Sequence, residues 1–356
     1  MTVDMAVLEA NIRRMAGLVG ATGARLRPHI KTHKTPEIAH MQLRNGSAGL
    51  TVAKLGEAEV MADAGFDDIF IANELVGPTK LRRLVGLSRR ISVRSCVDSI
   101  AGASMLSEAA VAHELMFEVL LDINTGLDRT GVAPKEARGF ARSISALPGI
   151  RLVGVFSYAG YRPATPSPEE RERWARREAE TAVRVADELR RDGVHVSEIS
   201  VAGTATAPFA ATVPGVTEVR PGTYVFNDIG YARLGLCDPS QCALTIKTTV
   251  VSRPSRDRAV IDAGSKVLAL DKRVVCGREP GYGFIKQWPA ARIEALWEEH
   301  GVIRVTADGP GPGVGDVLDV IPNHVCPTVN LADRWYGIKA GVVDGEFTIL
   351  GRGKSR

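Results

Sequence analysis

The sequence predicts an α/β protein in which a (β/α)8 barrel is followed by a C-terminal all-β domain. Short β-rich runs alternate with amphipathic helical stretches over the first two-thirds of the chain. Several of these runs are continuously apolar, which is typical of parallel strands covered on both faces. After about residue 240 the helical stretches give way to β-rich runs separated by glycine and proline. Periodicity alone leaves an open, doubly wound sheet as the alternative to a barrel.

The first predicted element is a helix, because Met5, Leu8, Ile12 and Met15 recur at helical spacing. Strand and helix then alternate in the manner of a barrel. The expected strands are 26–31, 49–52, 68–72, 91–97, 116–122, 152–157, 198–201 and 218–219. The expected helices between them are 36–43, 54–64, 79–88, 99–110, 134–146 and 168–191.

The barrel is expected to span residues 1–235 and the β domain residues 236–356, with the first few residues of the chain packing against the β domain. Runs such as ALTIKTTVVSRP and VLDVIPNHVCPTVNL favour strands, and GPGPGVGD is a dense turn cluster.

Composition excludes several classes of function. The chain has 356 residues, 45% hydrophobic and 24% charged, so it can bury a large core. Its net charge of +4 forms no basic stripe interleaved with aromatics, which argues against nucleic-acid binding. No apolar run approaches the ~20 residues that span a bilayer, and no signal-peptide pattern is present. Five irregularly spaced cysteines favour a cytoplasmic protein without a disulfide framework.

A basic segment, RPHIKTHK (27–34), ends the first predicted strand. In a parallel barrel, this end of a strand faces the active site. Lys31 would close the strand, and a lysine desolvated beside other cations has a lowered pKa and can form a Schiff base. The alternative is a cation-rich surface loop.

Three later segments carry glycine, threonine or arginine after a predicted strand. VAGTATA contains Gly203 and Thr204, where small residues would let main-chain N–H groups approach a phosphate. A simple tight turn explains this segment equally well. VRPGTY contains Arg220, and DINTGLDRTG contains Arg129. Either arginine could instead be a solvated charge.

His324 and Cys326, in PNHVCPTVN, are two residues apart and would share one face of an extended strand. Imidazole and thiolate together suit Zn²⁺. Two ligands leave room for water or substrate, as a catalytic metal requires. Glu298, Glu299 and His300 are further candidate ligands or supporting residues. The alternative is a buried cysteine and a hydrogen-bonded histidine in a β core.

Taken together, these segments resemble the D-serine dehydratase and D-threonine aldolase family. RPHIKTHK resembles the family's cofactor-lysine segment. DAGSKVLALD (262–271), EEHG (298–301) and IPNHVCPTVNL (321–331) match other characteristic stretches in the same order. The resemblance covers nearly the whole chain. It implies the alanine racemase architecture: a barrel that binds pyridoxal 5′-phosphate (PLP), then a β domain, assembled as a homodimer.

The resemblance also implies how the cofactor is held. Lys31 would bind PLP covalently, Tyr158 would lie against its ring, and Arg129 would lie near its phenolate oxygen. Arg220 would face the pyridine nitrogen, keep it unprotonated and weaken the ring as an electron sink. The residues that would hold the phosphate are Gly203, Thr204, Gly222 and Tyr224.

His324 and Cys326 would bind a divalent metal, Zn²⁺ or Mn²⁺, beside a small D-amino acid substrate. His-x-Cys resembles the dehydratases of the family, whereas the aldolases more often carry His-x-Asp. We therefore expect dehydration of a β-hydroxy D-amino acid such as D-serine or D-threonine, giving an oxo acid and ammonia. Retro-aldol cleavage to glycine and an aldehyde is the alternative.

Two other functions fit the sequence less well. A racemase would need a second base, and its tyrosine is not evident. A non-catalytic PLP-binding protein would not need the β domain. Two departures from the family also matter. The stretch AGYRPATP after Tyr158 replaces a histidine-bearing stretch, so substrate contacts are expected to differ. The chain also begins at what corresponds to the middle of the family's first strand.

Overall fold

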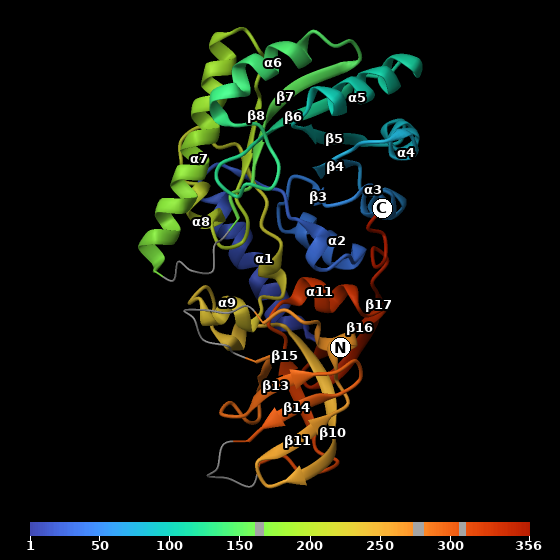
Figure 1. Ribbon diagram of the computed structural model, residues 1–356, viewed down its shortest axis with the longest axis vertical. Coiled ribbons are helices and arrows are strands. Elements are labelled where there is room, and N and C mark those ends of the chain that lie inside the picture. The colour runs from blue at the N-terminus through green and yellow to red at the C-terminus, as the bar shows by residue number, and fades with distance from the viewer. Residues whose placement is uncertain (161–166, 273–280, 306–310) are drawn as a thin grey trace.

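The computed structural model describes residues 1–160, 167–272, 281–305 and 311–356. It contains two sheets, one above the other in Figure 1. The upper sheet has eight strands in the order β2-β9-β8-β7-β6-β5-β4-β3. All of its neighbouring pairs are parallel. His29, in the segment that follows β2, forms a parallel bridge with Thr51 in β3. Because β2 and β3 are the first and last strands of this order, the two edges of the sheet approach each other. This confirms the predicted fold class.

Each barrel strand is short, and most of these strands are largely buried, as expected for strands covered on both faces. The barrel strands are β2 (Arg25–Leu26), β3 (Leu50–Val52), β4 (Asp68–Glu74), β5 (Ser92–Val97), β6 (Phe117–Ile123), β7 (Ile150–Ser157), β8 (Glu198–Val201) and β9 (Glu218–Val219).

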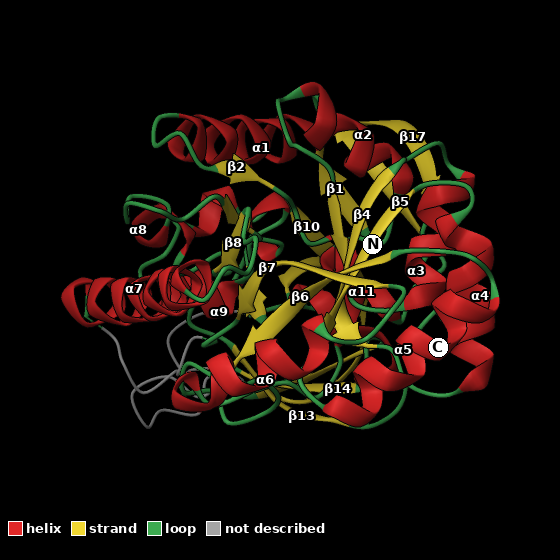
Figure 2. Ribbon diagram, turned by 90° about the horizontal axis from the view of Figure 1, so that it is seen from above, coloured by secondary structure: helices red, strands yellow, loops and turns green. Residues whose placement is uncertain are grey.

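Helices surround the barrel strands, as the view from above shows (Figure 2). The longest helix begins where the Ser167 side chain accepts a hydrogen bond from Glu170 N and Pro168 occupies the first turn. The helices of this part of the chain are α1 (Met5–Gly20), α2 (Pro36–Arg44), α3 (Leu55–Asp63), α4 (Pro78–Ser88), α5 (Ile100–Ala112), α6 (Ala137–Ser145), α7 (Pro168–Arg191), α8 (Ala207–Ala210) and α9 (Ile229–Arg233). Among the described residues, no helix combines the length and apolarity needed to cross a membrane.

The lower sheet combines both ends of the sequence. Strand β1 pairs antiparallel with β10 and parallel with β16, so residues 2–4 lie inside the C-terminal sheet. The expected division at residue 235 stays a prediction. The strands of this sheet are β1 (Thr2–Asp4), β10 (Leu244–Ser255), β11 (Arg258–Ile261), β12 (Phe284–Ile285), β13 (Arg292–Leu296), β14 (Gly301–Arg304), β15 (Val317–Ile321), β16 (Arg334–Lys339) and β17 (Val342–Thr348).

Two local predictions about the motifs are wrong. The first barrel strand ends at Leu26, and Lys31 lies in a 3₁₀ turn, Ile30–Thr32, rather than closing a strand. The run that contains His324 and Cys326 is not one extended strand. Strand β15 ends before Pro322, which has no N–H to donate to a ladder.

After that proline the chain turns into a short helix, α11 (Val325–Asn330). His324 precedes this helix in extended conformation, and Cys326 lies in its first turn. A second short helix, α10 (Ser265–Leu268), also interrupts the region expected to be wholly β.

Charged side chains fill the barrel interior near the amino ends of several strands. Arg27 is fully buried and donates from Nε to Glu218 at 2.7 Å and from a terminal nitrogen to Asp68 at 2.9 Å. Arg94 pairs with Asp68 and with Glu198. Removal of one partner from such a buried network strongly destabilises the fold, because an uncompensated buried charge remains.

An apolar layer lies above this network, formed by residues from four barrel strands, β4 to β7. Its members are Phe70, Cys96, Leu120, Val153 and Phe156. Phe156 of this layer also lines a cavity at the carboxyl ends of the strands, where the active site lies in other barrel enzymes.

Candidate active site

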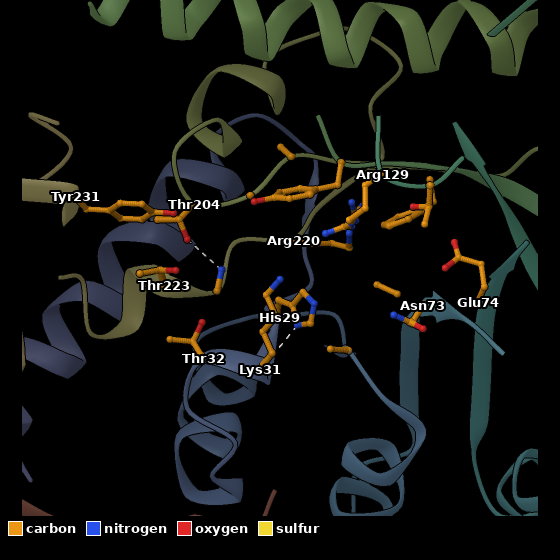
Figure 3. A pocket seen from close by; sticks show the side chains of 18 residues that line it. His29, Lys31, Thr32, Asn73, Glu74, Arg129, Thr204, Arg220, Thr223 and Tyr231 are labelled. Carbon is orange, nitrogen blue, oxygen red and sulfur yellow. Dashed lines mark hydrogen bonds between the residues drawn. The ribbon is translucent and has the colours of Figure 1, made fainter. Parts of the chain in front are cut away.

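A cavity of about 260 Å³ lies at the carboxyl ends of the barrel strands. Thr204, Thr223 and Tyr231 lie at one end of the cavity, and Asn73 and Glu74 at the other (Figure 3). The residues between the two ends include His29, Lys31, Arg129, Tyr158, Gly203, Arg220 and Gly222.

Lys31, and not its neighbour Lys34, lines the cavity. Lys31 Nζ lies 5.7 Å from the centroid of the Tyr158 ring. Burial lowers the pKa of the Lys31 amine below its ordinary value. Lys34 is held elsewhere, because its Nζ contacts Glu57 at 3.2 Å and donates to Asn330 at 2.8 Å. Lys31 is therefore the lysine placed to act as a nucleophile or base in this cavity.

His29 is a cavity residue to which the sequence assigned no role. Its buried imidazole has a pKa well below the ordinary value, because of burial and the nearby charges of Lys31 and Arg220. Nδ1 accepts a weak hydrogen bond of 3.4 Å from the main-chain N–H of Lys31. The ring is therefore neutral near pH 7 and fixes the turn that carries Lys31.

The hydroxyl of Thr204 organises one end of the cavity. Its Oγ1 accepts hydrogen bonds from Gly222 N at 3.0 Å and from Tyr224 N at 3.2 Å. Two main-chain N–H groups and a hydroxyl thus converge, which suits an anion such as phosphate. The Tyr224 side chain points elsewhere: it is buried, and its hydroxyl accepts a hydrogen bond from Gln42 at 2.9 Å. Only the main-chain N–H of Tyr224 serves this end of the cavity.

The two predicted glycines approach other groups too closely to carry a side chain. A Cβ atom at Gly203 would lie 2.9 Å from Cε2 of Tyr158, and one at Gly222 would lie 2.7 Å from the main-chain oxygen of His29. A side chain at either position would intrude on the cavity wall. The glycines, the threonine hydroxyl and the facing lysine therefore fit a phosphate-bearing carbonyl cofactor such as PLP.

The two predicted arginines differ in their surroundings. Arg220 is buried and donates to Ser200 Oγ at 2.6 Å and to the main-chain oxygen of Ser157 at 2.5 Å. Burial lowers the pKa of Arg220 to about 10, so it remains a fixed cation at neutral pH. Arg129 is exposed, and its guanidinium lies 5.7 Å from the Tyr158 ring centroid.

Carboxyl groups form the far end of the cavity, which the sequence did not predict. Glu74 lines the cavity, and Asp122 lies close to it. Burial raises the pKa of Asp122 to about 7, and the Glu74 carboxylate adds to this effect. Asp122 also accepts a hydrogen bond of 2.8 Å from the Thr130 hydroxyl, next to Arg129. Asp122 therefore helps to hold the loop that carries Arg129.

Cys326 lies against the cavity wall rather than in a β core. Its Sγ is 3.3 Å from the Thr32 hydroxyl and 3.9 Å from the Thr223 hydroxyl, and both threonines line the cavity. Burial alone would raise the pKa of the Cys326 thiol. Contacts with His324 and Thr32 outweigh burial, so the pKa lies below its ordinary value and favours the thiolate.

His324 has a carboxylate partner. Its Nδ1 lies 2.5 Å from Oδ2 of Asp271. A carboxylate at one ring nitrogen is the usual support of a metal-binding histidine, because it fixes the ring so that Nε2 faces the ion. The nitrogen and sulfur donors of His324 and Cys326 therefore fit a divalent metal. In the part of the chain that the structure describes, no group of three or more His, Cys, Asp or Glu side chains forms a complete metal site.

The remaining sequence candidates lie on the β13–β14 hairpin or close to Tyr158. Glu299 pairs with Lys266 at 2.6 Å where both side chains are exposed, and His300 accepts from Trp297 N through its main-chain oxygen. Most of the stretch AGYRPATP, residues 161–166, lies outside the described residues.

Two family models match the chain. "Alanine racemase, N-terminal domain" matches residues 3–229, and "Putative serine dehydratase domain" matches residues 243–338. A D-threonine aldolase from Arthrobacter sp is 35% identical over 100% of this chain and 93% of its own length. A D-threo-3-hydroxyaspartate dehydratase from Delftia sp. (strain HT23) is 32% identical over 92% of this chain and 90% of its own.

Solved structures give the same result. A D-threonine aldolase from Filomicrobium marinum has a TM-score of 0.91 and 34% identity, covering 100% of this chain and 95% of its own. An alanine racemase from Clostridium difficile 630 has a TM-score of 0.68 at 14% identity, covering 98% of both chains, and shows the fold alone. The chain therefore belongs to the D-serine dehydratase and D-threonine aldolase family of alanine racemase-like, PLP-dependent lyases.

Proposed function

We propose that the protein is a PLP- and divalent metal-dependent dehydratase of β-hydroxy D-amino acids. D-serine and D-threonine are the expected type of substrate, with an oxo acid and ammonia as products. The position of Cys326 carries this proposal. Its thiol contacts Thr32, the residue after Lys31, so the metal motif and the reactive lysine meet at one cavity wall.

The residues of the cavity suit the cofactor. PLP would supply an electrophilic carbon and an electron sink. Gly203, Thr204 and Gly222 would hold its phosphate through main-chain N–H groups and a hydroxyl. Arg220, fixed by its bonds to the barrel wall, would face the ring nitrogen and keep it unprotonated. Lys31 Nζ, with its lowered pKa, can accept the α-proton of a substrate amino acid.

His324 and Cys326 would hold Zn²⁺ or Mn²⁺, with Asp271 orienting the imidazole. The ion would act as a Lewis acid on the substrate's β-hydroxyl. A solved variant of D-threo-3-hydroxyaspartate dehydratase, 30% identical to this chain, has one cysteine replaced by alanine and is described as the metal-free form. In another solved variant of that enzyme a histidine two positions before this cysteine is replaced, which is the spacing of His324 and Cys326 in this chain.

D-threonine aldolase activity is the second candidate. The observation that favours it is the 35% identity over the whole chain with the Arthrobacter D-threonine aldolase, slightly above the identity with the dehydratase. In that reaction a base takes the hydroxyl proton and the Cα–Cβ bond breaks. We also propose a homodimer, which sedimentation equilibrium of the purified protein would test.

Product analysis tests the function directly. We expect D-serine and D-threonine to give an oxo acid and ammonia, with loss of product in EDTA and recovery on adding Zn²⁺ or Mn²⁺. Glycine with acetaldehyde from D-threonine would instead establish the aldolase. Product formation that survives EDTA together with full loss of bound metal would refute the role of the metal.

A His324→Ala variant provides the matching control. We expect it to lose bound metal, measured by elemental analysis, while it keeps the visible absorbance of PLP bound to Lys31. Metal content equal to that of the wild type would contradict the assignment of His324. Loss of visible absorbance in this variant would place His324 in cofactor binding instead.

A further inference from the structure

Glu178 is a buried carboxyl group behind the cavity wall, outside the residues assigned to the cofactor, the metal or the substrate. It lies on α7 and is 1% exposed. Oε1 accepts two hydrogen bonds, from Ala159 N and from Ala202 N, each at 3.1 Å. The other oxygen, Oε2, is buried without a hydrogen-bond partner of standard geometry among the described residues. One carboxyl oxygen thus joins two segments that are far apart in the sequence.

Both of these amides adjoin residues of the cavity. Ala159 follows Tyr158 at the end of β7, and Ala202 precedes Gly203 at the end of β8. The two segments touch closely, since a Cβ atom at Gly203 would meet the Tyr158 ring at 2.9 Å. The separation of these segments therefore sets the distance between the ring and the anion-binding end of the cavity.

Ala202 has an unusual backbone conformation. Its φ is +67°, in the left-handed region that non-glycine residues rarely adopt. Such strain persists only where the surroundings hold it in place. The hydrogen bond from Ala202 N to Glu178 is one interaction that does so, and it aims the following Gly203 at the cavity.

Burial of the Glu178 carboxyl is unfavourable unless its oxygens accept hydrogen bonds. Burial raises the pKa of Glu178 to about 7, although its two N–H donors, the Arg220 charge and the Ser157 hydroxyl oppose this effect. An apolar side chain of the same size would avoid the cost of burying a carboxyl group. It would, however, leave both main-chain N–H groups buried and unpaired.

We propose that Glu178 is a positioning residue that holds the Gly203–Thr204 segment against the Tyr158 ring and thereby shapes the cavity for a phosphate-bearing cofactor. Glu178 touches neither cofactor nor substrate and acts through Ala159 and Ala202. The proposal rests on the proposed function only for the identity of that cofactor as PLP.

Glu178→Leu and Glu178→Gln separate the acceptor role from simple packing. Leucine fills the space but accepts no hydrogen bond, whereas the amide oxygen of glutamine can accept both. Glu180→Gln, at an exposed position of the same helix, is the matched control. Two readouts are made on the apoprotein: hydrogen–deuterium exchange of residues 150–160 and 198–206, and the PLP dissociation constant from an absorbance titration.

In the leucine variant we expect exchange of the Ala159 and Ala202 amides to accelerate at least about tenfold and the PLP dissociation constant to rise at least about tenfold. The glutamine and control variants should stay within about threefold of the wild type. In an Ala202→Gly background, where positive φ carries no strain, the effect of leucine on PLP affinity should shrink.

Three results would overturn the proposal. The first is unchanged exchange and PLP affinity in the leucine variant. The second is an equal effect of leucine and glutamine on both readouts. The third is acceleration of exchange across β6 as large as that at the two amides, which would mean general destabilisation. Failure to find a lyase product would refute the proposed function instead, because neither readout requires turnover.

Discussion

Gly222→Ala tests most sharply the end of the cavity that we propose to bind the cofactor's phosphate. The new Cβ would lie 2.7 Å from the main-chain oxygen of His29 and 3.0 Å from Oγ1 of Thr32. The His29 oxygen cannot swing away as a side chain can, so the backbone at Gly222 must move. Overpacking of this kind costs about 1–3 kcal/mol. The movement would draw Gly222 N away from Thr204, and we expect PLP affinity to fall about 5- to 150-fold.

The assay is a PLP titration of the apoprotein by visible absorbance, combined with urea unfolding. Gly86→Ala, inside α4, is the control, because a Cβ there meets nothing within 4 Å. We expect the control to bind PLP normally and to gain about 0.5–1 kcal/mol in the free energy of unfolding. If Gly222→Ala matches the wild type in both PLP affinity and stability, the close approach at Gly222 does not shape the cofactor site.

Three further predictions concern charged side chains. Lys31→Ala should abolish the visible absorbance of bound PLP, whereas Lys34→Met should keep it but lower the free energy of unfolding by about 3–5 kcal/mol, because a buried carboxylate loses its partner. Glu218→Gln should lower the free energy of unfolding by a similar ~3–5 kcal/mol, measured in urea, because the buried charge of Arg27 would then face an uncharged amide instead of a carboxylate. Glu178 has a pKa of about 7 in the folded protein against an ordinary 4.5. The folded state therefore holds its proton longer, and stability should fall by about 3 kcal/mol more between pH 4 and pH 8 in the wild type than in Glu178→Gln.

Much of the barrel could be predicted because each local signal agreed with the global fold. Helix α7 has the bounds expected from the sequence, since Ser167 and Pro168 mark its start and alanines recur on its buried face. The His324 motif was harder. Two residues at this spacing fit an extended strand, and they fit equally well the cap and the first turn of a helix. Only Pro322 indicated that the strand ends before His324.

Contacts between distant residues could not be predicted from local patterns. Asp271 reaches His324 across 53 positions, and Glu178 bonds amides 19 and 24 positions away. A glutamate on a helix usually faces solvent. The one local hint was that Glu178 is in register with Ala175 and Ala182 on the buried face of α7.

The position of β1 has a consequence for synthesis on the ribosome. Residues 2–4 precede their partners on β10 and β16 by more than 240 and 330 residues. Until β10 and β16 have been synthesised, β1 therefore has open strand edges, which are a template for pairing with other chains. The C-terminal tail returns to the barrel, where Arg356 O accepts from Gly56 N beside α3 (Figure 1). β1 can complete its pairing only after β16 has been synthesised, and a chain truncated before β10 would leave both edges of β1 unpaired.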